Sequence, residues 1–277
     1  MKKIIAVFAV LMTVFLFGCG NPEIEPATSE PSSSTTEDPT VRVTFPEGLN
    51  CVQIAKKLEK NSVCSAKDFM AAVCDLDSVK DSYSFASKIE DSDEKAFVLE
   101  GYVFPDTYDF YKGESAERAL SRFLDNTQAK LTDEMYERAE ELGYTMDEII
   151  SLASIIQKEA GEVAEMGKVS SVLHNRIESP DYTRLQCDVT INYVNDYILD
   201  SPYIVGDTSR FSEYYNTYKV QGVPKGAICC PGIDAIKAAL YPEDTDYFFF
   251  VTDDDMNYYY SVTYAEHLEK CRMVGLL

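Results

Sequence analysis

One glutamate occupies a position in the sequence that would change its acidity. Glu159 follows Leu152 by seven residues and Ile156 by three, so on a helix its side chain lies on the same apolar stripe. Burial on that stripe raises the pKa of a carboxyl group, and so does the negative end of the helix dipole. A carboxyl group that stays protonated near neutral pH can act as a general acid. We therefore expect general-acid chemistry at Glu159.

The helix that must carry Glu159 has a clear start signal. Thr145 and Glu148 have the spacing of a capping box, in which the hydroxyl accepts from a backbone N–H and the glutamate reaches back to the cap. Gly161 favours a stop. An alternative is a helix that ends one turn earlier and leaves Glu159 as an ordinary exposed residue. The apolar residues that recur at helical spacing in between are Ile149, Leu152, Ala153, Ile156 and Ala160.

The composition narrows the possible chemistry. The 277 residues include 47 Asp and Glu against 25 Lys and Arg, a net charge of −22, which argues against nucleic acid as the main partner. The only histidines, His174 and His267, leave little room for His-rich zinc chemistry, so we expect no metal and no cofactor. Exported chains form disulfides, and the pairing of the eight cysteines stays open.

The first 40 residues predict targeting and tethering segments and no folded domain. A basic start is followed by the apolar run Ile4–Gly18, which is typical of a secretory signal and shorter than the ~20 residues of a spanning helix. Gly18-Cys19 resembles the lipobox of bacterial lipoproteins, which predicts lipidation of Cys19 and anchoring on the extracytoplasmic face of the cell membrane. The alternative is an uncleaved signal anchor. Residues 20–40, rich in Pro, Ser and Thr, predict a disordered tether.

Two folded parts are expected after the tether. Residues 41–98 combine a strand, a Pro-Glu-Gly turn, two short helices and a polar connector, and they resemble the LysM-like modules of cell-wall enzymes, which recognise N-acetylated glycans. A spacer role is the alternative. Residues 99–277 predict a larger domain in which the glutamate-bearing helices lie beside β-rich segments. The fold class that follows is α+β.

Eight motifs in order relate the chain to a known family. Together they resemble the MltG/YceG-like endolytic murein transglycosylases over about residues 41–277. The motifs are Leu99–Tyr108, Leu152–Ala160, Val172–Ile177, Leu185–Asp188, Asn216–Tyr218, Gly222–Ile228, Pro231-Gly232 and Ser261–His267. The chain departs from the family pattern at Val189, Lys225, Cys230 and Met256–Tyr258, in segments expected to face the substrate.

The resemblance implies a reaction and a site. Glu159 matches the family's catalytic acid, which cuts the β-1,4 bond between MurNAc and GlcNAc without water and leaves 1,6-anhydroMurNAc ends. It also implies peptidoglycan strands as substrate and work beside the glycan-polymerising machinery. Residues of the matched motifs are expected to bind sugar groups or orient Glu159, although each could instead brace the fold: Glu100, Asn175, Gln186, Asn216, Thr217 and Tyr218.

Two other functions stay open. A muramidase-type hydrolase would need a second carboxylate, for which Glu100, Glu162 and Asp188 are the candidates. A non-catalytic cell-wall-binding lipoprotein would use the LysM-like part alone.

Overall fold

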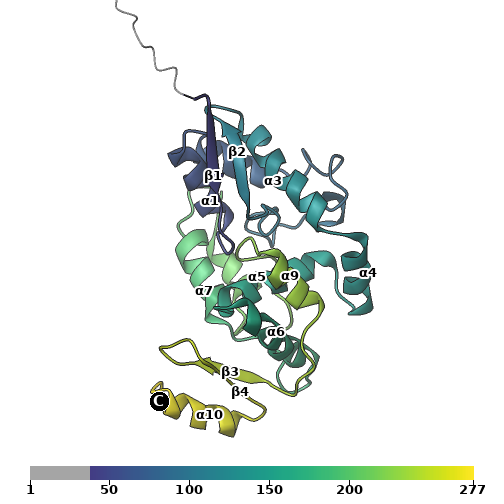
Figure 1. The fold of residues 1–277 in the computed structure, drawn as a ribbon, viewed down its shortest axis with the longest axis vertical. Helices are drawn as coiled ribbons and strands as arrows, with labels where there is room; N and C mark the ends of the chain where they lie inside the picture. The colour runs from purple at the N-terminus through teal and green to yellow at the C-terminus, as the bar shows by residue number, and fades with distance from the viewer. Residues whose placement is uncertain (1–37) are drawn as a thin grey trace, which may run out of the picture. The chain divides into compact units, whose positions relative to one another are not determined.

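Two small antiparallel sheets and a set of helices make up residues 38–277, the part of the chain that the computed structural model describes (Figure 1). This mixture agrees with the expected α+β class. The expected signal, the lipidation site Cys19 and nearly all of the tether lie outside the described residues. The strands are β1 (Thr40–Thr44), β2 (Thr107–Tyr111), β3 (Phe249–Thr252) and β4 (Tyr258–Ser261). The helices are α1 (Cys51–Lys60), α2 (Ala66–Val73), α3 (Ala116–Lys130), α4 (Asp133–Glu141), α5 (Met146–Glu159), α6 (Val163–Glu178), α7 (Asp188–Tyr193), α8 (Ser212–Tyr215), α9 (Ile233–Leu240) and α10 (Tyr264–Met273). Short 3-10 segments at Ala86–Lys88 and Ser209–Phe211 and a π-helical segment at Val194–Ile198 complete the regular structure.

The first sheet joins two segments that are far apart in the sequence. Strand β1 pairs antiparallel with β2, with Val43 opposite Tyr108. The pairing crosses residue 98, where we expect a domain boundary, so β2 completes the sheet that β1 begins. Phe123 of α3 packs edge-on against Phe45 with ring centroids 5.0 Å apart, and it also contacts Phe110. These buried rings hold α3 on the sheet.

Helices α1 and α2 begin where their capping residues predict. The Asn50 side chain accepts from the Gln53 N–H, and the Gln53 side chain accepts from the Asn50 N–H, which forms a capping box. Ser65 accepts from the Asp68 N–H in the same way. Local polar side chains therefore set both helix starts.

Helix α5 lies in the middle of the molecule, between the β1–β2 end and the β3–β4 hairpin (Figure 1). Its side chains are buried all round from Ile149 to Ile156, and it packs on α9. Two buried serines also attach it to the segment before α9: Ser151 donates to the Gly226 carbonyl, and Ser154 accepts from the Ile228 N–H, both at 3.0 Å. A helix buried on every face is fixed in position by its neighbours.

The turn after Leu99 needs a glycine to lie against α5. Gly101 has φ +92°, a conformation that favours glycine. A Cβ atom at this position would lie 2.6 Å from Ile150 and 2.7 Å from Ala227. The glycine therefore permits a close approach that any side chain would prevent.

A β-hairpin and a helix form the last part of the described residues. Strands β3 and β4 pair antiparallel, with Phe250 opposite Tyr260. Thr263 and Glu266 form a capping box at the start of α10, which packs on the hairpin. None of the helices within residues 38–277 is long and apolar enough to cross a membrane.

The capping box of α5 offers a test of this helix start. Replacing Thr145 by Ala removes the hydroxyl that accepts from the Glu148 N–H at 3.2 Å, so the free energy of unfolding should fall by about 1 kcal/mol. Urea denaturation measures the change. Thr132→Ala at the start of α4 is the matched control, because the Thr132 side chain makes no capping bond there. Equal losses in the two variants would contradict the assignment.

Candidate active site

The last turn of α5 is held in place by the hairpin. The helix continues through Glu159, and the Ala160 N–H still donates to the Ile156 carbonyl at 2.8 Å, so the alternative of an earlier helix end is wrong. The Tyr258 hydroxyl of β4 donates to the Glu159 carbonyl at 2.8 Å and accepts from the Gly161 N–H at 2.7 Å. This tyrosine thus satisfies backbone groups that the helix end leaves unpaired.

The Glu159 side chain faces a cavity of about 360 Å³. The walls come from the end of α5, from α6, from residues 185–188, from Tyr218 and from the β3–α10 part of the chain. The lining residues are Glu159, Arg176, Leu185, Gln186, Cys187, Asp188, Tyr218, Phe249, Phe250, Tyr264 and His267. Polar groups that converge on one partly aromatic cavity are typical of a ligand site.

The carboxyl group of Glu159 has the acidity expected of a general acid. Burial raises its pKa to about 7; a hydrogen bond from Cys187 opposes this shift, and the charge of Asp188 adds to it. Among the described residues no lysine or arginine pairs with this carboxyl group. The group is therefore poised to gain or lose a proton near neutral pH.

Cys187 is held so that its thiol reaches Glu159. The Thr217 hydroxyl accepts from the Cys187 N–H at 2.8 Å, and the Thr190 hydroxyl donates to the Cys187 carbonyl at 2.8 Å. The preceding residue, Gln186, has φ +56°, a strained conformation for a residue other than glycine. The Cys187 thiol is free; it lies 3.7 Å from the Leu185 carbonyl, to which it can donate, and hydrogen bonding from it to Glu159 lowers the pKa of that carboxyl group. All seven cysteines within the described residues are unpaired.

Four of the residues that the sequence singles out lie together at this cavity. Gln186 and Tyr218 line it with Glu159. Asp188, a candidate second carboxylate, lines it too and accepts from the Tyr218 hydroxyl at 2.8 Å. Glu162, another such candidate, is exposed and does not line the cavity.

Three other expected site residues support the walls from behind. Asn175 donates to the carbonyls of Thr245 and Tyr247 at 2.7 and 2.9 Å, which attaches α6 to the segment before β3. Thr217 is fully buried under Cys187. Asn216 ends α8, and its side chain accepts from the Tyr218 N–H at 2.9 Å. Their contacts orient residues that line the cavity.

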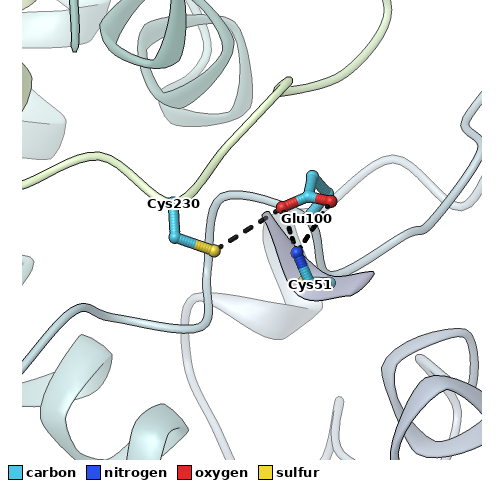
Figure 2. A group of neighbouring side chains, drawn as sticks. All are labelled: Cys51, Glu100 and Cys230. Atoms are coloured by element: carbon cyan, nitrogen blue, oxygen red, sulfur yellow. Dashed lines mark hydrogen bonds between the residues drawn. The ribbon is translucent and has the colours of Figure 1, made fainter. Parts of the chain in front are cut away.

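Glu100 lies apart from the cavity, buried between the start of α1 and the loop before α9 (Figure 2). Its carboxylate accepts from the Cys51 N–H at 3.0 Å, from the Tyr193 hydroxyl at 3.0 Å and from the Cys230 thiol at 3.6 Å. A carboxylate at the N-terminus of a helix is favourable because free N–H groups and the helix dipole meet there. Burial raises the pKa of Glu100 to about 7.

Cys51, Glu100 and Cys230 form the one cluster of possible metal ligands within residues 38–277. The two thiols and the carboxylate lie within 4.8 Å of one another. They supply three ligand atoms, one fewer than a closed structural zinc site, and the carboxylate already has hydrogen-bond donors. These contacts make the cluster a capped helix start that joins three segments of the chain.

Several cavity residues were not expected to act there. Arg176, His267 and Cys187 are not among the site residues that the sequence predicted. Arg176 and Cys187 do lie inside matched motifs, directly beside Asn175 and Gln186. Their positions inside the motifs could have suggested a place in the site, but a motif does not show which of its side chains face the cavity.

Comparisons with known proteins relate the chain to a family. The family model described as the YceG-like family matches residues 27–273. An endolytic murein transglycosylase of Bacillus subtilis is 26% identical over 241 residues, which cover 82% of this chain and 63% of the relative. One of Streptococcus pneumoniae is 24% identical over 240 residues, 81% of this chain and 43% of the relative. The chain therefore spans less than two thirds of the length of these relatives.

A solved structure has a similar fold. The crystal structure of a yceG-like protein from Listeria monocytogenes superposes with a TM-score of 0.68 and is 27% identical in sequence. The similarity covers 83% of this chain and 75% of that one.

The raised pKa of Glu159 predicts a pH-dependent stability. The pKa is about 7 in the folded chain against 4.5 for an unshifted glutamate, so the folded chain binds this proton more tightly. The stabilisation is complete below the unfolded pKa and is lost as the pH rises through the folded pKa. Glu159→Gln cannot ionise, so its free energy of unfolding relative to the wild type should increase by up to about 3 kcal/mol over that range. Urea denaturation at a series of pH values measures this; a constant difference would contradict it.

The thiol contact gives a second prediction. Removing the donor by Cys187→Ala should raise the pKa of Glu159 further, because the hydrogen bond favours the ionised carboxylate. Cys187→Ser keeps a donor and should give a pKa below that of the alanine variant. Carboxyl carbon NMR of labelled glutamate follows the titration. An alanine variant that titrates like the wild type would refute the contact.

Proposed function

Because the chain belongs to the YceG-like family, we propose that it is an endolytic murein transglycosylase. The proposed reaction cuts the β-1,4 bond between MurNAc and GlcNAc inside peptidoglycan strands and leaves 1,6-anhydroMurNAc ends. The names of the relatives support the general activity. The bond, the product and the roles of individual residues are our proposal.

In the first half of the reaction Glu159 acts as the acid. The protonated carboxyl group gives its proton to the oxygen between the two sugars. The bond from that oxygen to C1 of MurNAc then breaks, GlcNAc leaves with a hydroxyl group, and an oxocarbenium-like centre develops at C1. A pKa of about 7 means that an appreciable fraction of Glu159 is protonated at neutral pH.

In the second half the same group acts as the base. The 6-hydroxyl of MurNAc attacks C1 and forms the new C1–O6 bond, and its proton passes to the Glu159 carboxylate. The enzyme returns to its starting state without consuming water. A single carboxyl group with a pKa near 7 suits both halves, because it can give and take a proton at the same pH.

The observation that carries the proposal is the setting of Glu159 at the cavity. It is a partly buried carboxyl group at the rigid end of α5, without a cationic partner among the described residues, and it faces a cavity that can admit a sugar chain. A structural glutamate in such a place would normally be paired, because an isolated buried carboxylate is costly. A lack of pairing is what proton transfer to a ligand requires.

The position of Asp188 at the cavity also fits a second candidate function. It lines the same cavity as Glu159, so the pair could serve as the two carboxylates of a muramidase-type hydrolase. Its carboxylate is, however, engaged by the Tyr218 hydroxyl. Products distinguish the two reactions, because hydrolysis leaves reducing MurNAc ends.

We also propose that the first folded part contributes to glycan binding and that the chain works at the membrane. Asn50 and Gln53, from the LysM-like part, line a second cavity with Lys158 and Val189, which directly neighbour Glu159 and Asp188 in sequence. A glycan strand passing Glu159 could therefore extend toward this part. Lipidation of Cys19, or an uncleaved signal anchor, would hold the enzyme beside the glycan-polymerising machinery on the extracytoplasmic face.

The product of the reaction tests the proposal. The purified full chain, incubated with peptidoglycan sacculi, should release fragments with 1,6-anhydroMurNAc ends that mass spectrometry identifies. Glu159→Gln should lower the rate by about 10²-fold or more, because it removes the proton donor. Glu162→Gln is the matched control and should stay near the wild type, since Glu162 is exposed outside the cavity.

Three results would count against it. Reducing MurNAc ends would replace the transglycosylase by a hydrolase, with Asp188→Asn then expected to be inactive. Binding of sacculi without any release would favour a cell-wall-binding protein. An active Glu159→Gln variant would show that the acid lies elsewhere.

A further inference from the structure

Arg176 is a buried cation at the cavity, and no carboxylate of the described residues pairs with it. Its side chain lies on α6, is only 8% exposed and lines the cavity with Glu159. The chain contains 47 acidic residues, yet none of those that the structure describes forms a salt bridge with the Arg176 guanidinium, whose hydrogen bond goes to Gln186. A buried charge without a counter-charge is costly for the folded chain. Such an arrangement is typical of a group that pairs with a ligand.

The guanidinium is fixed in place, and part of its bonding capacity is unused. One terminal nitrogen donates to the Gln186 side chain, which is held by the strained backbone at that residue. The guanidinium carbon lies 5.4 Å from the centre of the Phe249 ring. The Nε–H is buried and has no hydrogen-bond partner among the described residues. Arginine carries five N–H donors, and the hydrogen bond to Gln186 uses one of them, so donors of the terminal nitrogens remain for an acceptor with two oxygens.

Resting on the proposed function, we propose that Arg176 binds a carboxylate carried by the MurNAc unit of the murein strand. A carboxylate supplies the missing negative charge as well as two acceptors, whereas the neutral carbonyl of an N-acetyl group would leave the charge uncompensated. Burial, and after it the charge of Arg176, lowers the pKa of His267 at the same wall, so Arg176 carries the positive charge there near neutral pH.

The carboxylate can come from two places on the same sugar. On a strand with peptide stems it belongs to the stem, since the lactyl group is then an amide. On a peptide-free strand it is the lactyl carboxylate itself. Both present an anion next to the sugar that loses its C1–O bond, so both would place that sugar relative to Glu159.

Binding to tetrasaccharide murein fragments tests the proposal. The inactive Glu159→Gln chain is titrated calorimetrically with peptide-bearing fragments, with the same fragments after conversion of their carboxylates to amides, and with peptide-free fragments. Amidation should weaken binding by about 10- to 100-fold, the range of a charged hydrogen-bonded contact. Retention of tight binding by the peptide-free form identifies the lactyl group as the source, and its loss identifies the stem.

Two variants separate a role in binding from a role in structure. Adding Arg176→Met to Glu159→Gln should weaken binding of the native fragments to the level of the amidated ones and abolish the difference between them. Arg210→Met is the matched control, because Arg210 also stacks on a phenylalanine, 4.8 Å from the Phe211 ring, but pairs with Asp93 outside the cavity. That variant should bind like the parent.

Specific results would overturn the proposal. Equal affinity of the Arg176-intact chain for native and amidated fragments would do so, even if Arg176→Met failed to fold. So would an Arg176→Met variant that loses native and amidated fragments to the same extent. Either result leaves the proposed function standing if the wild-type chain still makes 1,6-anhydroMurNAc ends. If the chain binds none of the fragments and the wild type makes no 1,6-anhydroMurNAc ends, both the Arg176 proposal and the proposed function are wrong.

Discussion

The burial of helix α5 on all sides is the constraint on which the rest of the structure depends. Its apolar residues pack against α9, and its two buried serines attach it to the segment that leads into α9. A helix held in this way cannot shift or rotate without leaving polar groups unpaired or creating voids. The carboxyl group at its last residue, Glu159, therefore has a defined position, and every other wall of the cavity is built around that position.

The cavity keeps an acid and a cation in one site without pairing them. Within residues 38–277, hydrogen bonding from the Cys187 thiol acts on Glu159, and Arg176 contacts the amide oxygen of Gln186 and the ring of Phe249. If the two formed an ion pair, Glu159 would be ionised well below neutral pH and could not act as an acid. Keeping them apart preserves the proton on one group and leaves the charge of the other for a ligand. The strained and therefore costly backbone of Gln186 serves both groups: its side chain accepts from Arg176, and it directly precedes Cys187, which acts on Glu159.

The acidic composition of the chain affects how it can bind an anionic ligand. A net charge of −22 repels an anionic polymer at long range, so binding of the proposed murein substrate would have to rest on local attraction. Screening by salt limits the repulsion to about 10 Å, while a buried cation acts inside a cavity where screening is weak. An acidic surface with one unpaired arginine in the site is therefore compatible with an anionic substrate.

The sequence by itself determined the local elements and the position of Glu159 on its helix. Capping side chains such as Asn50 and Thr145 mark helix starts because their hydrogen bonds involve neighbours in the chain, and the spacing of Leu152, Ile156 and Glu159 places a carboxyl group on a buried stripe. Family motifs pointed to Gln186 and Tyr218 as well. These inferences succeed where the physical cause lies within about one helical turn.

Only the tertiary structure decided which side chains meet at Glu159 and which do not. Glu100 lies in a matched motif, yet it caps α1 instead of facing the cavity, because the Gly101 turn directs it toward Cys51 and Cys230. Cys187 and Arg176 reach the cavity because Thr217 and Phe249, from distant segments, pack against them. Such contacts depend on how separate elements pack, and the spacing of residues along the sequence does not show which distant segments meet. The pKa of Glu159 likewise follows from burial by the whole fold rather than from its own helix.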